Sequence, residues 1–229
     1  MRAIQSGWGA KRSSNSFVTV TKAGYCRIAP ASHYESKRRY LDRTLVLETT
    51  FQTETGRARL IDCFTMRRGG EYDPHRQILR VIEGLRGNVE FRLDVVPRFD
   101  YGAIKPWIRC YRQDHHIAIG GCDGLLVSGD VPVTMKHHHA MTATFTVGAG
   151  QRRRLSILHR PPEILDENLV DVPDLDELDR HLQETIEWWQ NWSDQGQCSK
   201  PYADQLQRSA IVLKGLFNAP LRWATTWAS

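Results

Sequence analysis

Strict alternation of apolar and polar residues is the feature that most limits how this chain can fold. In the segment NVEFRLDVV, the odd positions from 89 to 95 are apolar and the even positions between them are charged. A strand buried on one face requires this period of two, because its successive side chains point to opposite faces. The segment is therefore predicted to be a half-buried β-strand.

The same period recurs from about residue 17 to residue 158. The segment TLVLETTFQTETGRARLIDCF predicts two strands joined by a turn at Glu54-Thr55-Gly56. Their apolar positions are Leu45, Leu47, Thr49 and Phe51 on one face of the first strand, and Ala58, Leu60 and Ile61 on the second. Turn residues also recur at 22–24, 86–88, 122–124 and 148–150, with no helical pattern between them. This spacing predicts antiparallel sheets packed as a sandwich, in a strand order that the sequence does not give.

The pattern changes near Pro161. The Pro-rich, acidic segment RPPEILDENLVDVPD is predicted to be a linker. A helix should follow, with Asp174 as N-cap, Glu177 completing a capping box, and Gly196 at its end. Its apolar stripe comprises Leu175, Leu178, Leu182, Ile186, Trp189 and Trp192. A second helix is predicted from Pro201 to Phe217, and its stripe comprises Tyr202, Leu206, Ala210, Leu213 and Phe217.

The chain is mildly basic, with a net charge of +5 and a pI near 9.0. The excess is spread out, apart from the runs Lys37-Arg38-Arg39 and Arg152-Arg153-Arg154. A nucleic-acid interface needs a basic stripe with interleaved aromatics, so these runs are predicted to be solvated and no nucleic-acid partner is expected.

The cysteines and the apolar runs bear on the compartment. The cysteines are odd in number and widely spaced, at Cys26, Cys63, Cys110, Cys122 and Cys198. That spacing favours reduced thiols in a cytoplasmic protein over a disulfide framework or a zinc site. We find no signal peptide and no apolar run long enough to span a bilayer, and therefore expect no membrane partner.

Several clusters could carry chemistry. Of the adjacent His137, His138 and His139, only the first and last could share a ligand set within a strand, so a surface loop or edge strand is favoured and no metal or cofactor is expected. The segment PRFDYGAIKPW groups Arg98, Asp100, Tyr101 and Trp107 where a strong strand ends. These residue types suit sugar recognition, and they equally suit a clamp on a neighbouring domain. For Trp188, Trp189 and Trp192, packing is favoured over a sugar-stacking platform.

The motifs GYCRIAP, RRYLDRTLVLETTFQTETGRARLIDCF, RVIEGLRGNVEFRLDVVPRFDYG, KPW and RSAIVLKGL occur in this order between Gly24 and Ala219. In this order the chain resembles bacterial trehalase-like and glucoamylase-like members of glycoside hydrolase family 15. The resemblance implies an N-terminal β-supersandwich, a helical linker and a C-terminal (α/α) barrel. The barrel carries the two glutamates that hydrolyse α-glucosidic bonds with inversion.

The resemblance implies a mainly β fold: an antiparallel β-supersandwich followed by a two-helix C-terminal linker segment. The expected divisions are a divergent N-terminal segment (1–16), the β-sandwich (17–160), a linker with the Trp-rich helix (161–198), and the first barrel helix with a divergent tail (199–229). Since both catalytic glutamates belong to the barrel, no catalytic residue is assigned here, and this chain alone is expected to be inactive.

The resemblance leaves three functions open. In the first, the chain is a non-catalytic N-terminal domain that supports or caps a barrel in cis or in trans. Arg98, Asp100, Tyr101 and Trp107 would then brace the barrel or line the rim of its cleft. In the second, it is a carbohydrate-binding or scaffold module acting in trans, with α-glucosides as ligands. In the third, it is a nonfunctional truncated remnant, whose unpartnered stripe of Leu206, Leu213 and Phe217 favours aggregation.

Overall fold

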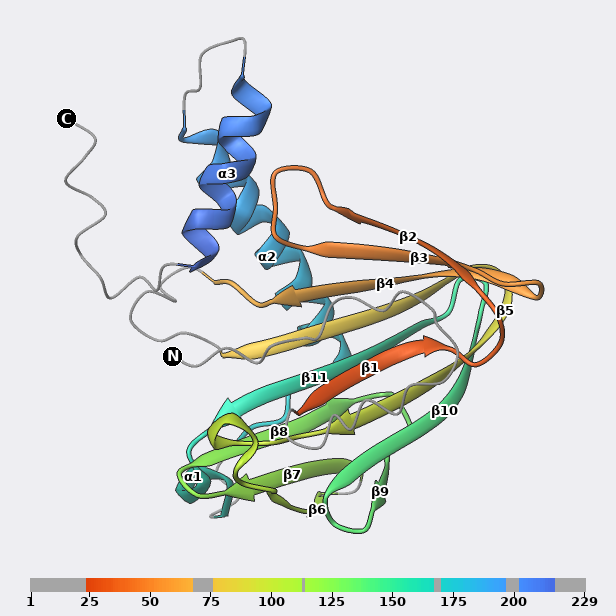
Figure 1. The fold of residues 1–229 in the computed structure, drawn as a ribbon, viewed down its shortest axis with the longest axis vertical. Coiled ribbons are helices and arrows are strands. Elements are labelled where there is room, and N and C mark those ends of the chain that lie inside the picture. Colours follow the sequence, from red (N-terminus) through yellow and green to blue (C-terminus); the bar gives the residue numbers. More distant parts are fainter. Residues whose placement is uncertain (1–23, 68–75, 113, 167–169, 197–201, 217–229) are drawn as a thin grey trace, which may run out of the picture.

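The computed structural model describes residues 24–67, 76–112, 114–166, 170–196 and 202–216 (Figure 1). The strands of these ranges are β1 (Tyr25–Pro30), β2 (Glu35–Tyr40), β3 (Leu47–Gln52), β4 (Gly56–Phe64), β5 (Gln77–Val96), β6 (Trp107–Tyr111), β7 (His115–Gly120), β8 (Asp123–Gly129), β9 (Thr134–Lys136), β10 (Ala140–Gly148) and β11 (Arg152–Arg160). The helices are α1 (Pro162–Asp166), α2 (Leu175–Asp194) and α3 (Ala203–Leu216). The predicted mainly β fold with C-terminal helices is confirmed.

The strands form two antiparallel layers that share one strand. The larger sheet has the order β2-β3-β4-β5-β11-β8-β7-β6, and the smaller has the order β1-β5-β10-β9. The first half of β5 pairs with β4 and β11, and its second half pairs with β1 and β10. β5 is therefore the corner at which the chain passes from one layer to the other.

The predicted turn at residues 86–88 is not a chain reversal. Gly87 lies inside β5 with φ of 61°, and the Asn88 amide donates to the Thr55 carbonyl oxygen at 3.1 Å. Left-handed backbone bends the strand here without ending it. The turns at 54–56 and 122–124 connect paired strands, and the turn at 148–150 connects β10 of the smaller sheet to β11 of the larger, whereas Lys22 and Ala23 lie outside the described residues.

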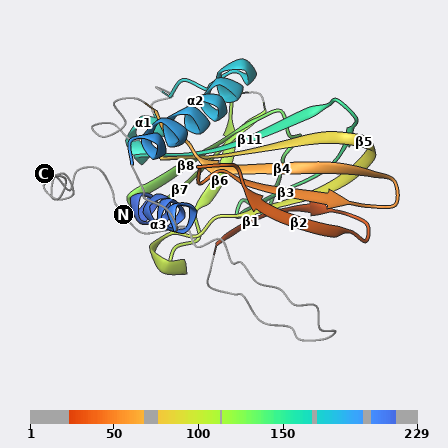
Figure 2. The same ribbon diagram turned by 90° about the horizontal axis from the view of Figure 1, so that it is seen from above.

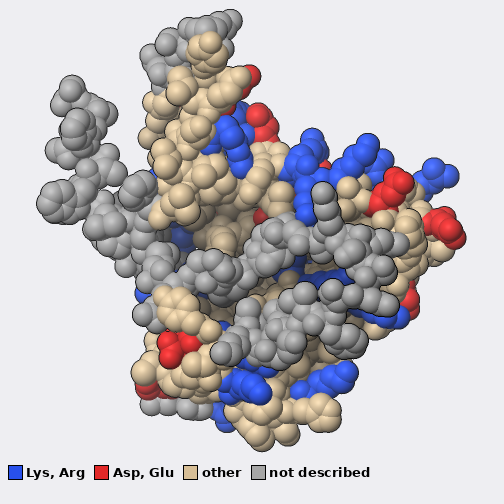
Figure 3. All heavy atoms as spheres, viewed as in Figure 1, with Lys and Arg blue, Asp and Glu red and all other residues tan. Residues whose placement is uncertain are grey.

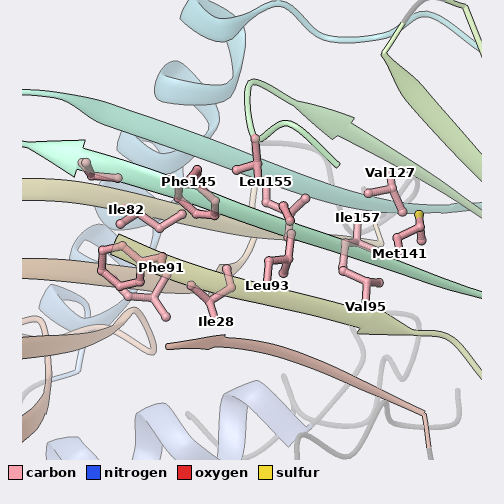
Figure 4. Close-up of a cluster of buried hydrophobic side chains, with 14 of the residues drawn as sticks. Ile28, Ile82, Phe91, Leu93, Val95, Val127, Met141, Phe145, Leu155 and Ile157 are labelled. Carbon is pink, nitrogen blue, oxygen red and sulfur yellow. The ribbon is translucent and has the colours of Figure 1, made fainter. Parts of the chain in front are cut away.

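The main core lies between the two sheets (Figure 4). The predicted alternation in the second half of β5 is confirmed, because Val89, Phe91, Leu93 and Val95 are all at most 2% exposed. The sequence predicted that the strand around residues 45–51 is buried on one face only, and this is incomplete. Thr49 and Phe51 of the predicted face are buried, but Val46 and Glu48 on the opposite face are buried as well. The reason is that the larger sheet is covered on both of its faces.

Helices α1 and α2 cover the outer face of the larger sheet (Figure 2). Leu178 and Leu182 of α2 pack on Ile61, Leu79 and Val81. The predicted N-cap is confirmed, since an Asp174 carboxylate oxygen accepts from the Glu177 amide at 2.7 Å. The predicted linker RPPEILDENLVDVPD contains the short helix α1, whose Leu165 is fully buried. Its apolar residues are drawn onto the sheet beside Tyr111 and Leu126.

The two basic runs differ in their surroundings. Lys37, Arg38 and Arg39 lie on β2, which is exposed along its length, and Figure 3 shows Lys and Arg side chains over the β2 and β3 end of the molecule. The prediction of a solvated run is wrong for Arg154, whose side chain is only 15% exposed and pairs with Asp130 and Asp179. Helix α2 covers this residue, which the sequence alone does not reveal.

Candidate functional site

The segment that joins β5 to β6 presents one of the two candidate aromatics. It is closed by paired backbone hydrogen bonds between Phe99 and Ile104, at 2.9 and 3.1 Å, and the Phe99 side chain is buried. Between them Asp100 and Tyr101 both adopt positive φ, 45° and 54°. Two consecutive left-handed residues other than glycine are costly, and such strain is concentrated at functional positions. The Tyr101 side chain, 76% exposed, lies at this turn.

Trp107, the first residue of β6, is the second candidate. Its side chain is 56% exposed although it stands at the start of a regular strand. The imidazole of His138 stacks on the indole with ring centroids 4.3 Å apart and planes 7° from parallel. The ring of His139 meets the indole nearly at right angles, at 5.7 Å. The indole is therefore fixed in place by two histidines while more than half of its surface stays open to solvent.

The histidine turn is itself tied to β6. His138 Nδ1 lies 3.2 Å from the Ile108 carbonyl oxygen, and His139 Nδ1 lies 2.9 Å from the Pro106 carbonyl oxygen. Because a carbonyl only accepts, each Nδ1 carries the proton in these contacts. The Ile108 amide also donates to the His138 carbonyl at 2.8 Å. The three histidines form the turn between β9 and β10, and His138 and His139 of this turn hold Trp107.

The four candidate site residues of PRFDYGAIKPW lie at the two ends of the segment that joins β5 to β6. Arg98, Asp100 and Tyr101 follow β5, where Arg98 Nη1 donates to the Pro97 carbonyl at 2.7 Å, and Trp107 begins β6. The sequence did not associate Trp107 with His138 and His139. Trp107 and His138 are 31 positions apart in the sequence, and no pattern within either segment indicates that they are in contact.

The three tryptophans of α2 form an edge-to-face cluster. Trp189 is 4% exposed, and its ring centroid lies 5.0 Å from that of Trp188 and 6.2 Å from that of Trp192. Helix α3 passes beside them, since Lys214 Nζ lies 5.9 Å from the centre of the Trp188 ring. A shallow pocket of about 230 Å³ lies between the C-terminal end of α2 and the middle of α3, lined by Trp192, Ser193, Gln195, Gly196, Gln207 and Ala210. The cluster lies at the contact between α2 and α3.

Within the described ranges, no group of three or more His, Cys, Asp or Glu side chains could hold a metal ion. No helix in those ranges is both long and apolar enough to cross a membrane.

Helix α3 leaves most of its apolar residues uncovered. In the described chain Ile211 is its buried residue, at 1% exposed. The stripe of exposed side chains comprises Tyr202, Leu206, Val212, Leu213 and Leu216, which are between 41% and 77% exposed. The predicted residue Phe217 lies outside the described residues. We call these five residues the α3 stripe.

Comparison with known proteins gives a distant relationship. No protein-family model matches the chain. The chain is 27% identical over 230 residues to a trehalase of Mycobacterium tuberculosis (strain ATCC 25618 / H37Rv), covering 86% of this chain and 31% of the relative. It is 26% identical over 222 residues to a trehalase of Mycolicibacterium smegmatis (strain ATCC 700084 / mc(2)155), covering 86% and 32%. The chain thus spans about a third of the length of these curated relatives.

Among solved structures, a protein described as a kojibiose phosphorylase from the human microbiome aligns over 82% of this chain and 27% of its own, with 10% identity and a TM-score of 0.38. The sequence similarity to the two trehalases supports a glycoside hydrolase-related domain.

Proposed function

We propose that this chain is a non-catalytic domain of a trehalase- or glucoamylase-like enzyme of glycoside hydrolase family 15, supporting an α-helical catalytic barrel in cis or in trans. The α3 stripe is the observation that carries the proposal. Leu206 and Leu213 are 52% and 54% exposed on a regular helix whose opposite side packs on the domain. Full burial of an exposed leucine contributes about 1.5–3 kcal/mol, and these half-exposed side chains would each gain about half of that, so a partner that covers this face is favoured.

A helical partner suits this surface because the side chains of a helix stripe interdigitate with those of a second helix. The trehalase relatives are about three times as long as the part that aligns with this chain, and the partner proposed here corresponds to the rest of their length. Hydrolysis with inversion requires two carboxyl groups about 6.5–9.5 Å apart across a sugar. In the proposed arrangement the partner supplies both carboxyl groups.

The test mixes the purified chain with the remaining part of the M. smegmatis trehalase, produced separately. We expect a complex by size-exclusion chromatography with light scattering, and no glucose release from trehalose or maltose by the chain alone. The double variant Leu206→Glu/Leu213→Glu should abolish the complex, whereas Tyr25→Glu, an exposed aromatic of β1, should leave it intact. Glucose release by the isolated chain, or a complex unaffected by the double variant, would contradict the proposal.

A carbohydrate-binding role in trans is the second candidate, favoured by the fixed, exposed indole of Trp107. Sugar rings stack on such a surface through their C–H faces, and an indole held in place loses little entropy on binding. Affinity electrophoresis in soluble α-glucan tests it. If α-glucan retards the unmodified chain and Tyr25→Ala but not Trp107→Ala, binding at this site is supported. If α-glucan does not retard the unmodified chain, binding is excluded.

A further inference from the structure

The two basic runs of the sequence meet on one face of the larger sheet. Residues paired across neighbouring strands share a face, and two such rows run across the sheet beside each other. The first row comprises Lys37, Thr50, Arg59, Glu83 and Arg152, and the second comprises Glu35, Gln52, Arg57 and Arg86. Lys37 belongs to the first basic run and Arg152 to the second. We call these nine residues, together with the neighbouring pair Arg39 and Glu48, the basic face.

The basic face lies on the side of the sheet that carries α2. Arg59 and Glu83 are two residues from Ile61 and Val81, which pack under this helix, and side chains two positions apart in a strand share a face. Helix α2 covers only part of the length of the strands. Figure 2 shows β3, β4, β5 and β11 continuing past α2, with none of the described helices over their far ends.

The groups that the basic face exposes are mainly cations. Glu48 and Glu83 are 5% and 7% exposed, whereas the side chains of Arg39, Arg59 and Arg152 are 70%, 35% and 38% exposed. These guanidinium groups pair with the two carboxylates and lie nearer the solvent. Exposed Lys37 and Arg57 take part in no ion pair among the described residues. Of the six cations, four carboxylates offset part of the charge, including that of Glu54 in the adjoining turn, so the surface stays positive.

The outward side of α2 has the opposite charge. On the side turned away from the sheet, the helix carries the carboxylates of Asp176, Glu177, Glu184 and Glu187. Arg180 lies 3.8 Å from Glu177 and offsets one of them. Asp194, at the end of the helix, is already paired with Arg43.

Two further cations lie near α2 and leave this side acidic. Arg67 acts on His181, and Lys214 of α3 lies 5.9 Å from the centre of the Trp188 ring. Positions 181 and 188 are two turns apart and share one flank of the helix, about a quarter turn from its outward side. Their cations therefore flank the row of carboxylates and do not interrupt it.

Helix and basic face together make a surface with a step. A helix with its side chains is about 10 Å thick, so the surface is high and acidic at α2 and low and basic beyond it. Two copies of such a surface fit when one is turned over, because each high side then fills the low side of the other. We propose that the chain forms a symmetric dimer in which α2 of each copy lies on the basic face of the other.

The dimensions agree with a weak dimer. Helix α2 has 20 residues and is about 30 Å long, and five strands span about 19 Å, so the helix can cross the whole basic face. A strip about 30 Å long and 10 Å wide, contacted twice, covers roughly 600 Å² on each copy. Interfaces of this size are at the low end of specific ones and are typically reversible.

Sedimentation velocity of the whole chain, from about 1 to 100 μM, tests the dimer. We expect a dimer in 0.1 M NaCl, with a dissociation constant on the order of 10 μM, and a monomer in 1 M NaCl, because the Debye length falls from about 10 Å to about 3 Å. The double variant Leu206→Glu/Leu213→Glu should dimerise like the unmodified chain, because the α3 stripe is not part of this interface.

Charge reversal identifies the two surfaces. Glu184→Arg/Glu187→Arg on α2 and Lys37→Glu/Arg57→Glu on the basic face should each weaken the dimer at least tenfold. An equal mixture of the two double variants should dimerise again, because each contact then joins opposite charges. The matched control, Arg27→Glu/Arg92→Glu, makes the same charge change at exposed positions of the smaller sheet and should leave the dimer intact. Circular dichroism checks that all variants fold.

Four results would overturn the proposal. They are a monomer at 100 μM in about 0.1 M NaCl, a dimer that about 1 M NaCl leaves unchanged, a mixture of the two reversed variants that stays monomeric, and loss of the dimer in Leu206→Glu/Leu213→Glu. The last result would assign the contact to the α3 stripe. The dimer does not rest on the proposed function, which the complex with the trehalase part tests separately.

Discussion

Arg154 on β11 holds Asp179 on α2 through both carboxylate oxygens, from Nε at 3.1 Å and from Nη2. Arg152 adds a third contact to the same carboxylate at 3.0 Å. The fork matches the planar guanidinium to the carboxylate, which makes it one of the stronger polar contacts in proteins. This basic run, expected to be solvated, therefore fastens helix α2 to the larger sheet.

Replacement of Asp179 by Ala should destabilise the domain by about 1–3 kcal/mol, because Arg154 would keep its largely desolvated charge with only the longer contact to Asp130, at 3.5 Å, to offset it. The side chains of Arg154 and Asp179 are 15% and 26% exposed, so little water is present to replace the lost contact. Urea unfolding followed by far-UV circular dichroism measures the change. Asp176→Ala, at an exposed position of α2, should cost no more than about 1 kcal/mol. Equal losses in the two variants would show that the fork contributes nothing of its own.

The domain should lose stability in acid through two carboxylates. Arg39 and Arg59, acting against burial, hold the pKa of Glu48 below its usual range. Burial raises the pKa of Asp179, but Arg154 and Arg152 more than offset this and keep it lowered. A folded-state pKa below the unfolded value means that the unfolded chain binds more protons as pH falls. The stabilisation is thus complete above the unfolded pKa, about 4, and is lost as pH falls through the folded values.

We expect a melting temperature that is nearly constant between about pH 7 and pH 5 and falls below about pH 4. Asp179→Asn should lower the plateau and make the acid limb shallower. If the melting temperature of Asp179→Asn falls as steeply below about pH 4 as that of the unmodified protein, groups other than Asp179 cause the acid instability.

The cysteines should differ widely in reactivity. Burial raises the pKa of the Cys63 thiol to about 12, with Asp62 adding to the shift, and Cys63 is 6% exposed. Cys110 and Cys122 are exposed. Only the thiolate reacts, so iodoacetamide at pH 8 should label Cys110 and Cys122 first and Cys63 only after unfolding. Peptide mass spectrometry assigns each site, and early labelling of Cys63 in the folded protein would contradict the burial.

The parts of the fold that follow from the sequence are those with local causes. The alternation from Val89 to Val95 and the Asp174 N-cap each depend on residues a few positions apart, and both appear as predicted. The course of β5 could not be predicted, because the turn residue Gly87 suits a reversal and a bend equally well. The partners of Trp107 could not be predicted either, since His138 reaches it only because the β9–β10 turn of the smaller sheet packs against β6 of the larger one.

Two substitutions on α3 should separate folding from partner binding. Ile211 is 1% exposed, so Ile211→Ala should cost about 2–4 kcal/mol of the free energy of unfolding. Leu213 is 54% exposed on the same helix, and Leu213→Ala should change that free energy by less than about 1 kcal/mol. Urea titration of the isolated chain measures both. A large loss for Leu213→Ala would mean that the chain already covers its own stripe, which would remove the main support for a helical partner.

The corner of β5 depends on a glycine for two separate reasons, and a matched pair of substitutions distinguishes them. Gly87 and Gly150 both have positive φ, 61° and 78°. A Cβ at Gly87 would lie 2.2 Å from the Thr55 carbonyl oxygen, whereas a Cβ at Gly150 would have no neighbour within 4 Å. Gly150→Ala should therefore cost only the left-handed backbone, about 1–2 kcal/mol.

Gly87→Ala should cost the same amount, about 1–2 kcal/mol, for its backbone angle and about 1–3 kcal/mol more for the close contact. The atom in contact is the backbone carbonyl oxygen of Thr55 in the β3–β4 turn, which cannot move aside without disturbing the pairing of β4 with β5. Urea unfolding of the two variants gives the difference directly. If the two losses are equal, close approach at the corner does not matter, and Gly87 is needed for its backbone angle alone. If Gly87→Ala is much the worse, the passage of β5 from one sheet to the other requires contact between this glycine and the β3–β4 turn.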